Sequence, residues 1–249
     1  MAVWLSRRLG ILYSKLYHKF RAEAFTSRDL AELVGKTGAA RIALLRLRKA
    51  GAVYVHEKRA GGWFYRLADP DVYILSLAGA LRNIEKIPQQ RYCRLVGIFS
   101  VELLKANVGV RSLILFGSVA RGNAKKDSDV DVLVVSDMFK SLGEAVDKLV
   151  EVEYSPRVIR ELEWLENNGV YTHLSFHPIS SATLRKHPPI ILDVVDEGIV
   201  VVDDGTYMKE ARIIKAKMKM LGAARIWLAE NEWVWVLKPD AKVGEVIEL

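Results

Sequence analysis

Apolar side chains recur at helical spacing through the first fifty residues of the chain. Thr26 or Ser27 is suitably placed to cap a helix that ends before Gly35. After the short turn 35–38, a further helix is expected to run to about Ala50, with Gly51 placed to end it in a left-handed conformation. Ahead of both, residues 3–20 carry one apolar stripe with basic residues between its members, which predicts an amphipathic helix: Trp4, Leu5, Leu9, Leu12, Leu16 and Phe20.

Two β-prone runs follow these helices, at residues 52–55 and 63–67, and a loop with Arg59, Gly61 and Gly62 joins them. Three helices followed by a hairpin resemble the winged helix-turn-helix family over about residues 5–67. That resemblance implies that the third helix enters the major groove of a nucleic acid and that the hairpin contacts the neighbouring backbone.

Charge is distributed unevenly along the chain. Residues 1–69 contain fourteen Lys and Arg and five Asp and Glu, a net charge of +9, although the whole chain carries +7. This asymmetry favours a polyanion as the partner of the N-terminal part, held mostly through phosphate contacts. The alternative is a module that mediates protein contacts or dimerisation. The candidate nucleic-acid-binding residues are Lys36, Thr37, Arg41, Arg48, Lys49, Lys58 and Arg59.

The overall composition narrows the class of protein. With 249 residues, 51% of them hydrophobic and 27% charged, the chain has the composition of a globular protein of one large or two small domains. No run of about 18 apolar residues and no signal-peptide pattern occurs, so we expect neither a membrane partner nor secretion. Cys93 is the only cysteine, which excludes an intrachain disulfide and fits a cytoplasmic location.

The rest of the chain predicts an α+β protein in three parts. A boundary is expected at Asp69–Pro70, where proline favours a turn or a helix start. Helices are expected over 71–86, 89–107, 138–167, 188–197 and 207–221, and strands over 112–116, 129–135, 170–179 and 199–202. The parts are 1–69, the winged helix; 70–205, a small mixed sheet flanked by helices, with 70–108 as connecting helices; and 206–249, a helix and a β-hairpin.

The stretch that carries chemistry lies between two apolar strands, from Leu113 to Val135. The first strand ends in Gly117-Ser118, and the second begins with Asp129 and Asp131. Alternate residues of a strand share a face, so these two carboxylates lie side by side. Two adjacent carboxylates repel each other unless a cation lies between them, and hard oxygen ligands suit Mg²⁺ or Mn²⁺.

The turn between these strands has the features of a phosphate site. Gly117 allows close approach of the backbone, and Ser118 offers a hydroxyl and an amide where a helix begins. Arg121 adds a cationic fork for phosphate oxygens, or else pairs with a local carboxylate.

Gly117-Ser118, ten intervening residues and Asp129-x-Asp131 resemble the signature of the polymerase-beta-type nucleotidyltransferase superfamily, and the Gly-Ser-x-Ala-Arg-Gly variant resembles the minimal nucleotidyltransferases of bacteria and archaea. The resemblance implies a metal-dependent enzyme that transfers a nucleoside monophosphate from a nucleoside triphosphate, with ATP favoured, to a hydroxyl. Asp129 and Asp131 would be catalytic metal ligands, and Gly117, Ser118 and Arg121 would bind the phosphates. The acceptor would be a nucleic acid or a protein, and a protein partner or homodimer is also implied.

The family's third carboxylate, on a neighbouring strand, is missing from the expected place. The face of the run 170–179 that carries His173, Ser175 and His177 contains no acid. Either histidine is a candidate for this position, as is an acid from elsewhere, such as Asp193 or Asp196. The alternative is that both histidines are ordinary exposed residues of the strand. The alternative function is a non-catalytic, nucleotide-sensing DNA-binding regulator or an antitoxin-like protein with a degenerate site.

Near the end of the chain, Trp233 and Trp235 alternate in a predicted hairpin that turns at Glu230-Asn231-Glu232. They would form an oligomer contact or a platform for the acceptor, or they would pack against the preceding domain, which is the interpretation we favour.

Overall fold

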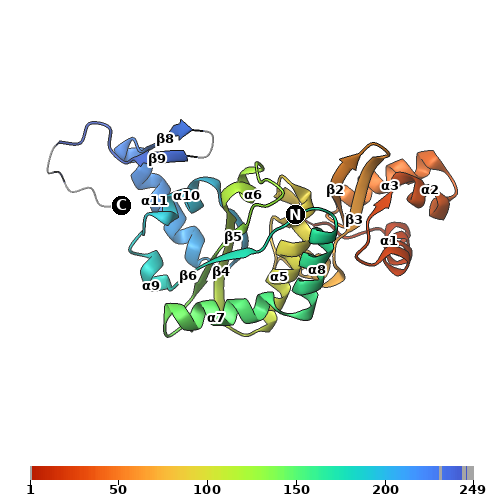
Figure 1. Cartoon of the computed structure of the whole chain (residues 1–249), viewed down its shortest axis with the longest axis horizontal. Coiled ribbons are helices and arrows are strands. Elements are labelled where there is room, and N and C mark those ends of the chain that lie inside the picture. Colours follow the sequence, from red (N-terminus) through yellow and green to blue (C-terminus); the bar gives the residue numbers. More distant parts are fainter. Residues whose placement is uncertain (1, 230–231, 243–244, 246–249) are drawn as a thin grey trace.

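A computed structural model describes residues 2–229, 232–242 and 245 of the chain. Its N-terminal elements lie at one end of the molecule (Figure 1). In the second helix, Thr26 accepts a hydrogen bond from the Asp29 amide while the Asp29 carboxylate accepts from Thr26 N, a capping box. Gly35 ends that helix at φ 78°. The elements are α1 (Arg7–Phe20), β1 (Phe25–Thr26), α2 (Ser27–Val34), α3 (Thr37–Lys49), β2 (Val53–Arg59) and β3 (Gly62–Leu67).

These helices and the hairpin follow the predicted order, with one addition. The short strand β1 pairs with β3, which makes a three-stranded antiparallel sheet in the order β1-β3-β2. The assignment of this unit to the winged helix family remains a prediction from the sequence.

The connecting segment differs from the prediction of a helix over 71–86. Helix α4 (Pro70–Leu77) stops early, because Gly79 at φ 77° and Asn83 at φ 59° turn the chain out of a helical path. Two 3₁₀ turns, η1 (Ile84–Lys86) and η2 (Gln90–Tyr92), lead into α5 (Cys93–Lys105).

The centre of the molecule is a four-stranded mixed sheet in the order β6-β5-β4-β7. Only β5 and β6 are parallel, and β4 runs antiparallel to both of its neighbours. Alternate residues of β5 face two separate hydrophobic clusters, Val132 one and Leu133 the other. The predicted α+β class with a small mixed sheet flanked by helices is confirmed. The strands are β4 (Val110–Phe116), β5 (Val130–Ser136), β6 (Leu174–Ile179) and β7 (Ile199–Asp203).

Helices cover both faces of this sheet (Figure 1). Helix α5 packs on one face with α7 (Leu142–Glu153) and α8 (Pro156–Asn167), and α10 (Ile190–Glu197) and α11 (Thr206–Leu221) pack on the other. The single helical region expected over 138–167 is therefore two helices, because Pro156 starts a new one at its first position. The short helices α6 (Gly117–Arg121) and α9 (Ser181–Leu184) follow β4 and β6. Strand β6 begins later than expected, at Leu174.

The N-terminal unit is joined to the central sheet by a shared core. One hydrophobic cluster runs from Leu16 of α1 through Phe99 of α5 to Val201 of β7. A buried ionic triad spans the same junction, since Glu161 of α8 pairs with Arg66 of β3 and with Arg94 of α5.

The C-terminal hairpin consists of β8 (Ala224–Ala229) and β9 (Glu232–Val236), which pair with each other. Two residues of its predicted turn, Glu230 and Asn231, lie outside the described residues. In the part of the chain that the structure describes, no helix is long and apolar enough to cross a bilayer.

Candidate functional site

The Gly-Ser turn sits where β4 ends, directly against the first residues of β5. Phe116 pairs with Asp131 in the sheet register, and Gly117 follows at φ 72°. A Cβ on Gly117 would lie 2.2 Å from Asp131 Oδ2, so a side chain at this position would occupy the place of that carboxylate. Ser118, half-buried, is the next residue of the α6 turn. The structure therefore brings together the two halves of the motif.

Each aspartate of the pair has a histidine beside it. His173 Nδ1 lies 3.1 Å from Asp129 Oδ1, and His177 Nε2 lies 3.9 Å from Asp131 Oδ1. Both carboxylates remain accessible to solvent, Asp129 at 42% and Asp131 at 29% of the side chain. The two aspartates and the two histidines named from the sequence thus form two Asp–His pairs.

His177 is held more firmly than His173. Its ring stands edge-on to Phe116, with centroids 5.1 Å apart, and its Nε2 lies 3.4 Å from Ser175 Oγ. His173 precedes β6 and is largely exposed. Because Asp131 pairs with Ser175 in the parallel register of β5 and β6, the strand position beside Asp131 carries no acid.

An acid that the sequence did not single out reaches the turn from the opposite side. Glu197, the last residue of α10, accepts hydrogen bonds from Gly117 N at 3.0 Å and from Arg121 Nη1 at 2.6 Å. Its other carboxylate oxygen accepts from Arg225 Nη1 of β8 at 2.8 Å. Glu197 therefore binds two of the groups that the sequence assigned to phosphate. Its only signal in the sequence was its place at the end of the helix predicted over 188–197.

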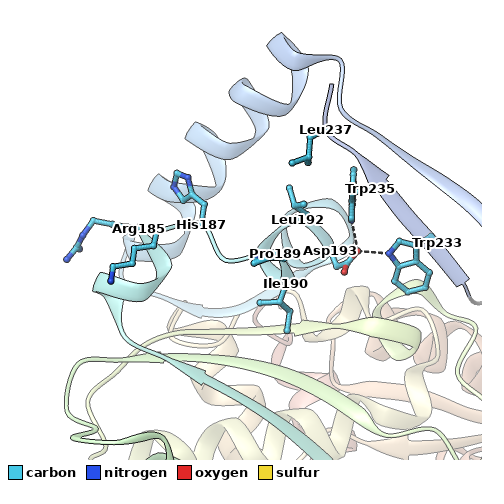
Figure 2. A pocket seen from close by; sticks show the side chains of 10 residues that line it. Arg185, His187, Pro189, Ile190, Leu192, Asp193, Trp233, Trp235 and Leu237 are labelled. Carbon is cyan, nitrogen blue, oxygen red and sulfur yellow. Dashed lines mark hydrogen bonds between the residues drawn. The ribbon is translucent and has the colours of Figure 1, made fainter. Parts of the chain in front are cut away.

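Asp193 and Asp196, the acids suggested as a third carboxylate, are directed to the hairpin. Asp193 Oδ1 accepts from Trp233 Nε1 at 2.8 Å and from Trp235 Nε1 at 2.9 Å (Figure 2). It also accepts from Arg225 Nη2 at 2.8 Å. Asp196 lies 3.3 Å from Arg225. These contacts fix the hairpin on α10, in line with the favoured interpretation of its tryptophans. One wall of a cavity of about 950 Å³ beside α10 is formed by Asp193, Trp233 and Trp235.

Two features of the site bear on a bound cation and a phosphate. The carboxylates of Asp129 and Asp131, completed by substrate phosphates, are the donor set that Mg²⁺ commonly uses in nucleotide enzymes. Among the described residues, no group of three or more His, Cys, Asp or Glu side chains is arranged to enclose a metal without such a substrate. Arg121 Nε is buried and has no acceptor in the described part of the chain, which leaves a donor for an anion. The residues therefore fit a cation held jointly with a triphosphate.

All seven candidate nucleic-acid-binding side chains are exposed. They belong to two elements, because Lys36, Thr37, Arg41, Arg48 and Lys49 lie on or directly before α3 and the other two end β2. Arg59 is already engaged, with Glu57 and with Asn168 Oδ1 at 3.2 Å. Exposed Ile42 and Leu45 interrupt the basic surface of α3.

Comparison with known proteins places the central part of the chain in a class. Residues 100–201 match the family model of the nucleotidyltransferase domain. The resemblance seen in the Gly-Ser and Asp-x-Asp motif is thus confirmed, and the chain carries a nucleotidyltransferase domain.

A particular relative is a protein adenylyltransferase, MntA, of the archaeon Thermococcus cleftensis. It is 46% identical over 50 residues, which are 20% of this chain and 46% of that protein. The chain thus matches less than half of this relative's length. A solved structure, described as a toxin-antitoxin with AMP-PNP, covers 50% of this chain and 90% of its own at 14% identity and a TM-score of 0.33, too weak a likeness to support an argument.

Proposed function

We propose that the chain is a divalent-cation-dependent nucleotidyltransferase that transfers a nucleoside monophosphate to a hydroxyl of a protein or nucleic-acid acceptor. The observation that carries this proposal is the contact of Asp131 with the Gly117 turn, at which only glycine leaves room for the Asp131 carboxylate, with Asp129 two residues before it. The name of the archaeal relative, a protein adenylyltransferase, favours ATP as the donor and a protein as the acceptor.

In this proposal each group of the site has a task. Asp129 and Asp131 hold Mg²⁺ or Mn²⁺, which supplies neutralisation of charge on the attacking and leaving oxygens. The β- and γ-phosphate oxygens accept hydrogen bonds from the Gly117 amide, the Ser118 hydroxyl and the Arg121 guanidinium. Because Glu197 binds Gly117 N and Arg121 in the free protein, it has to release both groups when the triphosphate enters.

His177 takes the position of the missing third carboxylate. The acceptor hydroxyl oxygen forms a bond to the α-phosphorus, the bond from that phosphorus to the bridging oxygen of the β-phosphate breaks, and pyrophosphate leaves. The hydroxyl proton passes to the His177 imidazole, which Phe116 and Ser175 keep beside Asp131. His173 orients Asp129.

Calorimetric titration of ATP tests this proposal. We expect binding that requires Mg²⁺ or Mn²⁺ and that Asp131→Asn abolishes, because one carboxylate cannot replace the pair. Asp147→Asn is the matched control, since Asp147 is an exposed acid of α7. Transfer is then measured with α-labelled ATP and candidate acceptors.

Binding that is independent of a cation, or that Asp131→Asn leaves intact, would overturn the assigned site. Cation-dependent binding without transfer to any acceptor would favour the regulator that the sequence left as an alternative.

We further propose that the N-terminal unit holds a nucleic acid through phosphates. The support is the net charge of +9 and the exposure of all seven candidate side chains. We expect the logarithm of the affinity for duplex DNA to fall linearly with the logarithm of salt concentration. The slope of this line should be roughly −0.9 for each phosphate contact. Fluorescence anisotropy at a series of salt concentrations measures the slope.

The double variant Arg41→Ala, Arg48→Ala removes two of the proposed phosphate contacts. We expect it to reduce the magnitude of the salt slope by about two. A flat salt response would contradict nucleic-acid binding. It would instead favour a protein partner, consistent with the apolar groove of about 480 Å³ that Leu9, Ile11 and Ile42 line.

A further inference from the structure

The inner face of the C-terminal hairpin carries four large side chains, and three of them are used to attach it. Trp233 and Trp235 donate their indole N–H groups to Asp193, and Arg225 pairs with Asp193, Asp196 and Glu197. The Arg225 guanidinium lies 4.8 Å from the ring centroid of Trp233 and 5.1 Å from that of Trp235. The Arg225 side chain is only 9% exposed. These contacts account for the position of the hairpin on α10.

Trp227 is the fourth side chain of this face, and attachment does not explain it. Its ring lies 5.2 Å from that of Trp233 and 5.6 Å from the Arg225 guanidinium, so it continues the same row of side chains. Unlike the other two indoles, it has no hydrogen bond to Asp193 within the described part of the chain, and 49% of the residue is exposed. About half of Trp227 therefore remains open to solvent.

This row begins at the phosphate turn. Arg121, four residues after Gly117, stands over Trp233 with its guanidinium 4.9 Å from the ring centroid. The order in space is thus Gly117, Arg121, Trp233 and Trp227. A nucleoside triphosphate extends from its terminal phosphate through the ribose to a flat base, so a triphosphate on Gly117 and Arg121 can bring its base to an aromatic side chain in this row.

We propose that Trp227 is the stacking platform for the nucleobase of the donor triphosphate, an inference that rests on the proposed nucleotidyltransferase function. Aromatic side chains stack on bases with about 1–3 kcal/mol per base and with little discrimination among them. The platform therefore contributes affinity for any nucleoside triphosphate. It favours purines, because a purine has a larger ring area than a pyrimidine for stacking on the indole.

Binding of ATP and of inorganic tripolyphosphate, each with Mg²⁺, separates the base from the phosphates. By calorimetry, Trp227→Ala is expected to weaken ATP binding about 5- to 150-fold and to leave tripolyphosphate binding unchanged, whereas Trp227→Phe retains most of the ATP affinity. Trp63→Ala is the matched control, because Trp63 of β3 is also 49% exposed but belongs to the N-terminal unit. It is expected to change neither affinity.

The outcomes distinguish this inference from the function on which it rests. ATP binding that Trp227→Ala leaves intact would overturn the platform alone, and a loss limited to acceptor transfer would assign Trp227 to the acceptor instead. Equal losses of ATP and tripolyphosphate would mean that Trp227 only attaches the hairpin, which also overturns the inference. Absence of cation-dependent ATP binding by the unaltered protein would overturn the proposed function and the platform together.

Discussion

Replacing Glu161 with Gln is expected to lower the free energy of unfolding by about 3–5 kcal/mol, because it leaves two buried arginines without a counter-charge. Glu161 Oε2 accepts from Arg66 Nη2 at 2.9 Å and from Arg94 Nε at 3.2 Å, and all three side chains are at most 5% exposed. Burial lowers the pKa of Arg66 to about 10 even with Glu161 beside it, which indicates how much the site already disfavours the positive charge.

Thermal unfolding followed by circular dichroism measures this effect, expected as a fall in the midpoint on the order of 10 °C. Glu166→Gln is the control, since Glu166 is exposed on the same helix. Because the triad and the hydrophobic cluster both join the N-terminal unit to the central sheet, we also expect one cooperative transition. A midpoint within a degree of that of the unaltered protein would contradict the role given to Glu161.

Features set by neighbouring residues could be predicted from the sequence. The caps of α2, the Gly117 turn and the spacing of Asp129 and Asp131 at the start of β5 all depend on residues a few positions apart. The early end of α4 was missed because apolar residues continue at helical spacing past Gly79, while the positive φ angles there and at Asn83 become visible only in the structure.

Contacts between distant segments could not be predicted in the same way. Arg66 and Glu161 are 95 residues apart, and each reads in the sequence as an ordinary surface charge. Glu197 is 80 residues from Gly117, so its role at the turn depends on the packing of α10 against α6. The search for a third carboxylate considered Asp193 and Asp196 on the same helix, but their side chains point to the hairpin.

Replacing Glu197 with Gln is expected to raise the affinity for a triphosphate about tenfold while lowering stability by roughly 2 kcal/mol. Affinity rises because the entering phosphates no longer displace a carboxylate from Gly117 N and Arg121. Stability falls because Arg225, 91% buried, loses one of its charged partners, although Asp193 and Asp196 remain. Calorimetry with Mg²⁺-ATP and thermal unfolding measure the two changes separately.

Asp196→Asn provides the control for charge alone. It removes one negative charge from the same helix and from the same arginine, but Asp196 is exposed and its contact is with Arg225 rather than with the turn. We therefore expect it to change ATP affinity less than Glu197→Gln does. Equal gains in the two variants would mean that long-range charge, and not occupation of the phosphate positions, opposes binding. A lower affinity in Glu197→Gln would show that Glu197 instead holds the turn in its binding conformation.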